Sequence, residues 1–242
     1  CALPIYVRLA WTTADQPSYS DGGQPITAFE VRILGAGGVP RSGAPIYCAS
    51  SPQMLASRLC EIPMAALTAQ AGLYRLPLGR LIQATVAARN SVGLGPFSAL
   101  NSVGVLAQTA PLAPASPPTR DPASTQRALV VHYPFPVTTQ PLPGFEDGGS
   151  TLLSLNLQWD QGSAGAAWVT LVGESPRATT DSYTVLLAQD GSDAGRTYKF
   201  RARAYNIHGW GPFSAPADVL AADFPGVVDG ARIAKVGGTD VE

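Results

Sequence analysis

The sequence predicts an all-β protein made of two β-sandwich domains in tandem, joined by a proline-rich linker. The main observation is a repeat: residues 88–99, ARNSVGLGPFSA, return at 204–215 as AYNIHGWGPFSA, with every shared residue displaced by 116 positions. This period is far longer than a solenoid unit and indicates two copies of one domain. Asp-Gly-Gly also occurs twice, at 21–23 and 147–149, with a displacement of 126, so the copies differ by loop insertions.

Strand patterns follow both Asp-Gly-Gly phrases. Apolar and polar residues alternate over 26–33, and an apolar-rich run occupies 152–159, as expected of buried or half-buried strands. The glycines of the repeated phrases supply the positive φ values that tight turns require. No long stretch repeats an apolar face at helical spacing. Short strands between Gly and Pro turns predict two sheets around one core in each domain, and 242 residues leave room for two such domains.

The repeated phrases resemble the middle and end of a fibronectin type III domain, over most of the chain, twice. In the second copy the run 198–214 carries Tyr-x-Phe-x-Ala-x-Ala-x-Asn followed by Gly-x-Gly-Pro-Phe-Ser. Trp11 matches the tryptophan of the family's second strand, and the second copy has Tyr133 in its place. Ile82 stands where the family's strand tyrosine, kept at Tyr198, belongs. Because neither exchange removes a large core side chain, the resemblance implies immunoglobulin-like, fibronectin type III sandwiches on a remote branch.

The expected organisation is a first domain over 1–109, a linker over 110–122, a second domain over 123–225 and a C-terminal tail over 226–242. The linker's prolines favour extended polyproline conformations, which predicts a semi-rigid spacer in an elongated rod. Its composition also resembles the hydroxyproline-rich, O-glycosylated stretches of algal and plant cell-surface proteins. The candidates for O-glycosylation are Pro111, Pro114, Ser116, Pro117, Pro118 and Thr119. No Asn-x-Ser/Thr sequon is present, which excludes N-glycans of the usual type.

The composition is poor in charge. Asp, Glu, Lys and Arg make up 14% of the residues and the net charge is -1, against about 25% charged residues in ordinary soluble domains. Nothing directs such a chain toward nucleic acid or anionic lipid. A weakly charged surface is commonly covered by a partner, another copy or glycan, with a sparsely charged monomer as the alternative.

The chain begins at Cys1 without a signal peptide, and no apolar run approaches the roughly 18 residues of a membrane span. We interpret it as a processed product or an excerpt of a longer polypeptide, secreted in either case. Cys48 and Cys60 lie in the segment by which the first copy exceeds the second, which predicts a disulfide that stabilises by about 3 kcal/mol. Two buried thiols are the alternative. Cys1 has no predicted partner within the chain. It can form an intermolecular disulfide, carry a lipid or remain a free thiol.

Neither a metal, nor a cofactor, nor catalysis is expected. His132 and His208 fall on a predicted strand and in a turn, and no Cys-x-x-Cys spacing occurs. Gly-x-Ser-x-Gly, a phosphate-binding glycine loop and His-Glu-x-x-His are absent. Asp21 and Asp147 occupy equivalent positions of the repeat, which favours a role in turns over a pair of catalytic carboxylates.

The two ends of the chain suggest how copies assemble. A type III domain opens with an edge strand before the tryptophan strand; 118–127 can form it in the second copy, but only ten residues precede Trp11 in the first. The tail beyond 225 could supply that strand to another copy, because an open sheet edge is a template for an added strand. The expected acceptor residues are Ile5, Val7, Leu9 and Trp11, and the expected tail residues are Val227, Val228, Ile233, Ala234 and Val236.

A head-to-tail contact of this kind need not close into a ring and generates a filament. The sequence therefore favours an extracellular fibre or surface-coat subunit whose partners are other copies of itself. In a rival interpretation the sequence is cut from a longer tandem chain, and the tail begins a third domain. A second class is a ligand-binding ectodomain of an adhesin or receptor, acting through loops such as 90–95 and 206–211, with Trp168 and Trp210 as adhesive candidates. A third is a spacer in a secreted glycan-degrading enzyme.

Overall fold

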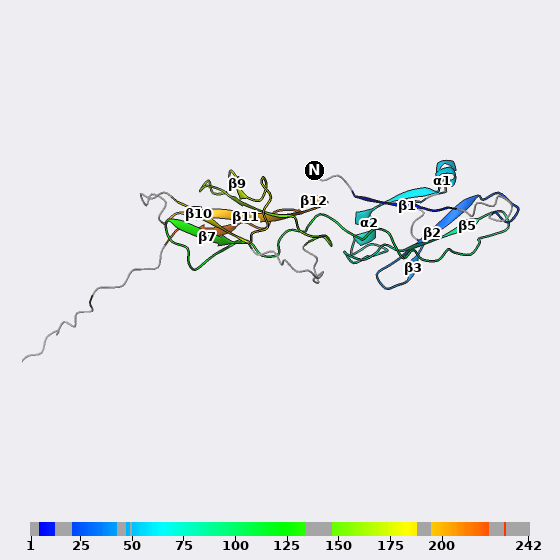
Figure 1. Ribbon diagram of the computed structural model, residues 1–242, viewed down its shortest axis with the longest axis horizontal. Helices are drawn as coiled ribbons and strands as arrows, with labels where there is room; N and C mark the ends of the chain where they lie inside the picture. Colours follow the sequence, from blue (N-terminus) through cyan, green and yellow to red (C-terminus); the bar gives the residue numbers. More distant parts are fainter. Residues whose placement is uncertain are drawn as a thin grey trace, which may run out of the picture.

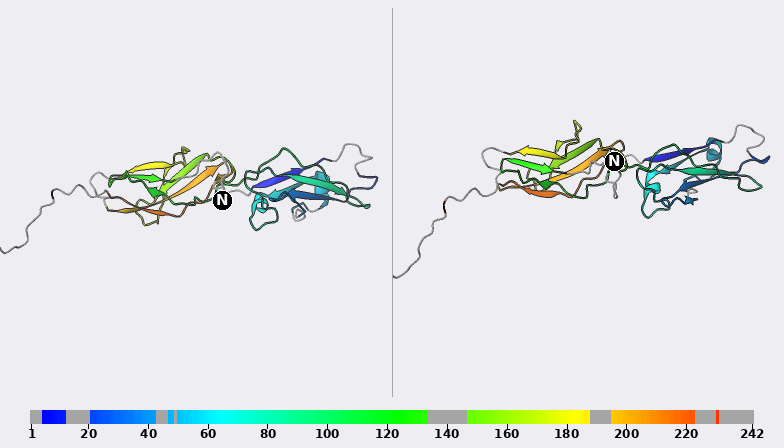
Figure 2. Two further views of the ribbon diagram at one scale, coloured as in Figure 1. Left: turned by 90° about the horizontal axis from the view of Figure 1, so that it is seen from below. Right: turned by 60° about the horizontal axis from the view of Figure 1, so that its bottom comes forward.

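Two β-sandwich domains lie end to end (Figure 1), and Figure 2 shows the same arrangement from two other sides. The computed structural model describes residues 5–12, 21–42, 47–48, 50–133, 147–187, 195–222 and 230. Apart from two short helices, the regular elements in these ranges are antiparallel strands. The predicted all-β tandem fold is confirmed.

Domain one has two sheets. β1 (Tyr6–Ala10) pairs with β4 (Leu59–Pro63), and β2 (Ala28–Leu34) lies between β3 (Pro40–Arg41) and β5 (Ala84–Arg89). Alternation along β2 turns one side of this strand inward, and this side packs against the first sheet. The buried side chains of the core include Val7, Val31, Ile33, Ile62, Met64, Leu67, Tyr74, Leu76 and Ile82.

The segment by which domain one exceeds domain two folds into α1 (Pro52–Ser57), whose N-cap Ser51 accepts the Met54 N–H. After β4 the chain forms α2 (Met64–Thr68). A disulfide joins Cys48 to Cys60, with 5.2 Å between the Cα atoms. This is the predicted pair, and both cysteines lie within the core of domain one.

Domain two has a first sheet in the order β10 (Ser182–Leu186), β7 (Ala128–His132), β6 (Thr119–Arg120). Its second sheet has the order β12 (Gly209–Trp210), β11 (Thr197–Asn206), β8 (Ser154–Trp159), β9 (Val169–Val172), and β13 (Ala217–Leu220) also pairs with β11. Tyr133, in the tryptophan position, is 2% exposed and Phe200 is fully buried. The tyrosine therefore fills the core of domain two as the resemblance requires.

The first strand of domain two, expected within 118–127, is present as β6, so the segment expected to be a semi-rigid spacer joins domain two earlier than predicted. β6 lies inside the range 110–122 and pairs with β7, so it belongs to the first sheet of domain two. Pro111, Pro114 and Pro118 are buried, because the segment that contains them packs on the domain that follows. Within the described part of the chain, no helix is long and apolar enough to cross a membrane.

Candidate assembly surfaces

β1 has one free edge in the part of the chain that the structure describes. Its other edge pairs with β4 along its whole length. The Trp11 N–H donates to the carbonyl oxygen of Arg58 on the β4 side, so the odd-numbered residues of this strand direct their backbone polar groups toward β4. The N–H and C=O groups of Tyr6, Arg8 and Ala10 therefore point to the free edge.

The equivalent strand of domain two, β7, has both edges covered. The tryptophan position aligns β7 with β1 and puts Val130 at the place of Arg8. The Val130 N–H donates to Ser124 Oγ at 2.9 Å, and its carbonyl oxygen accepts the Asp121 N–H at 2.9 Å. The free edge of β1 carries the same backbone donors and acceptors, which are available for equivalent bonds to an added strand.

Side-chain burial differs between the two strands in the same way. Val131 of β7 is fully buried, whereas Leu9, which aligns with it, is only partly buried. Tyr133 hydrogen-bonds Thr180 through its hydroxyl group at 3.2 Å. Trp11, at the equivalent position of domain one, keeps a buried indole N–H that has no hydrogen-bond partner among the described residues. The edge strand of domain one thus covers its core less completely.

The four expected acceptor residues lie on or beside β1. Val7 is buried, and Ile5, Leu9 and Trp11 pack partly buried against the same core. The expected tail residues lie outside the described residues: Val227, Val228, Ile233, Ala234 and Val236.

A second contact surface is the junction between the domains. The Thr109 N–H donates to the carbonyl oxygen of Gly148 at 2.8 Å, and Gln108 Nε2 donates to that of Gly149 at 2.8 Å. Asn206 Nδ2 donates to the carbonyl oxygen of Thr109 at 2.8 Å and to that of Asp147 at 2.8 Å. The exit of domain one is therefore hydrogen-bonded to two turns of domain two.

His208 extends the junction. Its Nε2 lies 3.1 Å from Gln108 Oε1, and burial lowers the pKa of His208 below its usual value. Asp21 and Asp147 serve as turn residues, since the Oδ1 of each accepts the N–H two residues further on, from Gly23 and Gly149. The predicted role in turns matches this geometry.

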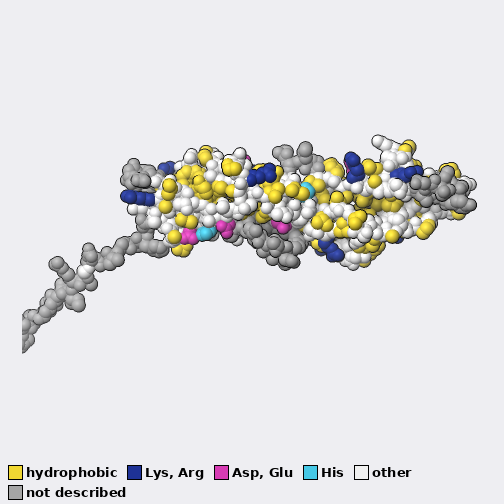
Figure 3. Space-filling model, viewed as in Figure 1, with side chains coloured by type: hydrophobic (Ala, Val, Ile, Leu, Met, Phe, Trp, Pro, Cys, Tyr) yellow, Lys and Arg dark blue, Asp and Glu magenta, His cyan; other side chains and the backbone are white. Residues whose placement is uncertain are grey.

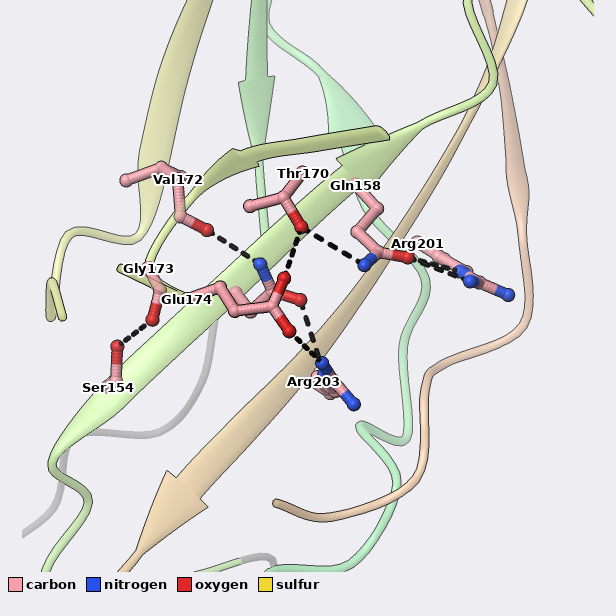
Figure 4. A network of polar contacts seen from close by, with 9 residues as sticks. Ser154, Gln158, Thr170, Val172, Gly173, Glu174, Arg201 and Arg203 are labelled. Carbon is pink, nitrogen blue, oxygen red and sulfur yellow. Dashed lines mark hydrogen bonds and ion pairs between the residues drawn. The ribbon is translucent and has the colours of Figure 1, made fainter. Parts of the chain in front are cut away.

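The outer face of the second sheet of domain two carries a polar network that sequence reasoning missed (Figure 4). Arg201 donates to Gln158 Oε1 at 2.7 and 3.0 Å. Arg203 donates to Glu174 Oε1 at 2.9 Å and to Asn156 Oδ1 at 3.2 Å. Alternation along β11 could have placed both arginines on one face, but their partners lie about 30 to 50 residues away in sequence.

Aromatic rings stack on the same two guanidinium groups. Arg201 lies 4.1 Å from the ring centroid of Trp168 and 4.0 Å from that of Phe213. Arg203 lies 4.4 Å from Phe213 and 4.6 Å from Trp210. The two tryptophans named as adhesive candidates therefore belong to an arginine–aromatic stack on the outer face of this sheet, within one domain.

The remaining candidates are placed as follows. Pro111, Pro114 and Pro118 are buried, which argues against sugar on their rings, whereas Ser116 and Thr119 are exposed and Pro117 is half-buried.

His132 pairs with Asp121 at 2.5 Å. Across the described ranges, no three His, Cys, Asp or Glu side chains lie together in a group that could hold a metal ion. Charged side chains are few on the face shown in Figure 3.

No family model and no curated protein matches the chain. Among solved structures, chicken CNTN1 domains FN1–FN3 match at 15% identity and a TM-score of 0.41, covering 91% of this chain and 63% of theirs. Titin domains A168–A170 match at 13% and 0.42, covering 92% and 60%. The C. elegans twitchin kinase region matches at 22% and 0.33, covering 47% and 17%.

The chain spans about three fifths of the first two solved structures it matches. It resembles tandem fibronectin type III and immunoglobulin-like domains. The strand order described above defines the structural class of the protein, which is two antiparallel β-sandwiches in tandem.

Proposed function

We propose that the protein is a structural module of an extracellular fibre or surface coat, and that its copies join head to tail by strand addition at the free edge of β1. The observation that carries this proposal is the contrast between Arg8 and Val130. The backbone groups of Val130 are satisfied by Asp121 and Ser124, while those of Arg8 face an edge without a partner in the described ranges. The donor is the tail 226–242 of another copy.

The direction of the chain suits a head-to-tail contact. β11 runs from Thr197 to Asn206, and Asn206 is bonded to the junction. Leu220 at the end of β13 lies opposite Thr197, about 30 Å away along the strand at roughly 3.3 Å per residue. A chain leaving Leu220 therefore departs from the end of domain two that faces away from domain one, where the next copy would be met.

The compartment is proposed from the Cys48–Cys60 disulfide, which favours an oxidising environment. Ser116 and Thr119 are the proposed O-glycosylation sites, because both are exposed. An intact mass equal to the bare 25.1 kDa chain for material from its natural source would exclude the glycan.

The test compares two substitutions at one edge position. Arg8→Pro removes an N–H that points away from β4, so the ladder between β1 and β4 can persist. Arg8→Ala keeps that N–H and removes the same ion pair with Glu61, which the wild type forms at 2.8 Å. We expect electron microscopy to show filaments for Arg8→Ala and isolated rods for Arg8→Pro. Filaments from both variants would contradict strand addition at this edge.

Deleting 226–242 provides a second test. The truncated chain should remain monomeric, and its first domain should unfold at a lower temperature than the first domain of the assembled protein. A synthetic peptide of residues 226–242 should raise the unfolding temperature of the first domain in the truncated chain. The same peptide should have no effect on a truncated chain that also carries Arg8→Pro. Filaments from the truncated chain would remove the tail as the donor.

A further inference from the structure

The junction between the domains is made of two surfaces, and each has a counterpart at the opposite end of the molecule. We call the first the exit surface, and in domain one it is formed around Gly79, Arg80 and Ala107. The Gly79 N–H donates to the Ala107 carbonyl oxygen, and the Ala107 N–H donates to the Arg80 carbonyl oxygen, both at 2.7 Å. Domain two repeats this pair of bonds, since Gly195 N–H donates to Ala221 O and Ala221 N–H to Arg196 O, both at 2.8 Å.

The second is the entry surface, formed in domain two by the turns at 147–149 and 206–209 and by Gly211. Its central bond joins Asn206 Nδ2 to the Asp147 carbonyl oxygen at 2.8 Å. Domain one forms the same bond between Asn90 Nδ2 and the Asp21 carbonyl oxygen at 2.6 Å. Both surfaces of the junction thus occur twice, and only the inner pair is joined within one chain.

Glycines show how tightly the inner pair fits. A Cβ atom on Gly149 would lie 2.5 Å from the Gly79 nitrogen, and one on Gly211 would lie 2.4 Å from the Pro111 carbonyl oxygen. Such distances leave no room for a side chain. The entry surface of domain two therefore requires glycine because domain one and its exit segment lie directly against it.

The entry surface of domain one keeps the same glycines without this constraint. A Cβ atom on Gly23 would meet nothing within 4 Å, and one on Gly95, the counterpart of Gly211, would meet only the Ala88 carbonyl oxygen at 3.3 Å. An open groove of about 810 Å³ runs over this surface, lined among others by Gly22, Asn90 and Gly95. In domain two the corresponding space is occupied by the exit segment at 109–112.

We infer that the entry surface of domain one binds the exit surface of domain two of a second copy, so that the contact between copies repeats the internal junction. The occupant of the groove is the segment that follows Leu220. The sequence supports this choice: residues 219–225, VLAADFP, match 105–111, VLAQTAP, with a displacement of 114. The inference deepens the proposed head-to-tail assembly and rests on different contacts from the β1 edge.

The side chains at the contact between copies differ from those of the internal junction. By the displacement of 116, Val92 takes the place of His208, and by the displacement of 114, Ala222 takes the place of Gln108. The hydrogen-bonded pair of the internal junction thus becomes an apolar pair. Val92 is 82% exposed, and contact with Ala222 of a second copy would remove apolar surface from water.

The same displacement gives the donated strand a register. Ile233 and Ala234 fall at the positions of Thr119 and Arg120, which form β6. Since Thr119 lies opposite His132 in the sheet, Ile233 should lie opposite Ala10, the residue of β1 that aligns with His132.

The first test places a side chain on the entry surface where there is space for it, and its control carries the same backbone strain. Gly23 has φ +78° and Gly38 has φ +73°, and a Cβ atom would meet nothing within 4 Å at either position. Asn tolerates this backbone region better than other residues with side chains. In sedimentation of the intact chain, Gly23→Asn should weaken self-association at least about tenfold, while Gly38→Asn, in the β2–β3 turn, should leave it unchanged. Equal self-association of both variants would overturn the inference.

This result can be separated from that of the proposed function. If Gly23→Asn associates normally while Arg8→Pro does not, the strand addition stands and the groove contact is wrong. If Gly23→Asn loses association while deletion of 226–242 has no effect, the groove contact stands and the strand addition is wrong.

Cross-linking supplies a second measurement that does not depend on a loss of assembly. In a Cys1→Ser background, Val92→Cys combined with Ala222→Cys should give a ladder of linked chains with a short bismaleimide. The matched control combines Ala222→Cys with Val39→Cys, whose wild-type side chain is 50% exposed and lies in the β2–β3 turn. A ladder from the control alone, or from neither protein, would contradict the contact.

Discussion

His208 in domain two hydrogen-bonds Gln108 at the end of domain one, with 3.1 Å between Nε2 and Oε1. Burial lowers the pKa of this histidine, so the folded state favours the neutral ring. The unfolded state binds the proton more tightly, with a pKa of about 6.5. The stability contributed by this effect is therefore complete above about pH 6.5 and is lost as the pH falls from there through the folded-state pKa.

We expect His208→Gln to reduce the loss of stability between pH 7.5 and pH 5.5. Glutamine cannot titrate and can still bond Gln108, so the slope of unfolding free energy against pH should be flatter than in the wild type. Urea unfolding at a series of pH values measures this slope. A variant that loses as much stability as the wild type over this range would show that His208 is not responsible.

Asp160 organises the turn after β8. Its carboxylate accepts the N–H groups of Gly162, Gly165 and Lys199, each at 2.9 Å, and the residue is 1% exposed. Burial raises its pKa, but these N–H donors together outweigh burial, and the pKa is lowered. The resulting stability is present above about pH 4 and declines as the pH falls through the folded-state pKa.

Asp160→Asn should cost about 1–3 kcal/mol at pH 7, because an amide NH₂ group replaces an acceptor in a ring of donors. Asp218→Asn is the control: the Asp218 side chain is 62% exposed and pairs with Lys199 at 2.7 Å, so its loss should cost less than about 1 kcal/mol. Urea unfolding followed by tryptophan fluorescence compares the two. Similar losses in both variants would contradict the role given to Asp160.

Cys60→Ser should destabilise domain one by about 2–4 kcal/mol and leave domain two nearly unchanged. The reason is that the lost cross-link closes a loop inside domain one, with its cysteines 12 residues apart. Calorimetry should show one transition moving to lower temperature and the other staying in place. Cys1→Ser serves as the control and should move neither. A shift of the domain two transition would indicate that the Cys48–Cys60 disulfide also stabilises domain two across the junction.

Arg203→Lys should destabilise domain two by about 1–3 kcal/mol, although charge is kept. Lysine cannot stack a planar group between Trp210 and Phe213 while also bonding Asn156 and Glu174. Arg8→Lys is the control, since Arg8 makes one exposed ion pair and should lose little. Chemical denaturation of both variants decides whether the stack is structural. An unchanged midpoint for Arg203→Lys would leave the arginine–aromatic stack available for another role.

The fold could be predicted from the sequence because its signals are local. The Asp-Gly-Gly turns, the alternation along β2 and β11 and the 12-residue spacing of the two cysteines each lie within one short stretch.

The linker could not be predicted in the same way. Composition alone favours an extended spacer, but Pro111 is buried because Gly211, 100 positions away in sequence, leaves room for its carbonyl group. The arginine–aromatic stack was missed for the same reason: Trp168, Arg201 and Phe213 come from three separate segments. Contacts that depend on such pairings become visible only once the sheets are assembled.

The close approach of Gly149 to Gly79 has a geometric consequence for any polymer built with the inferred contact. One fixed rotation and translation carries domain one onto domain two, and the same operation would carry domain two onto the first domain of the next copy. The fibre would then follow a screw axis whose repeating unit is a single domain, not a whole chain. Its diffraction would show a strong layer line at the domain spacing, and only a faint one at twice that spacing would report the differences in sequence between the two domains.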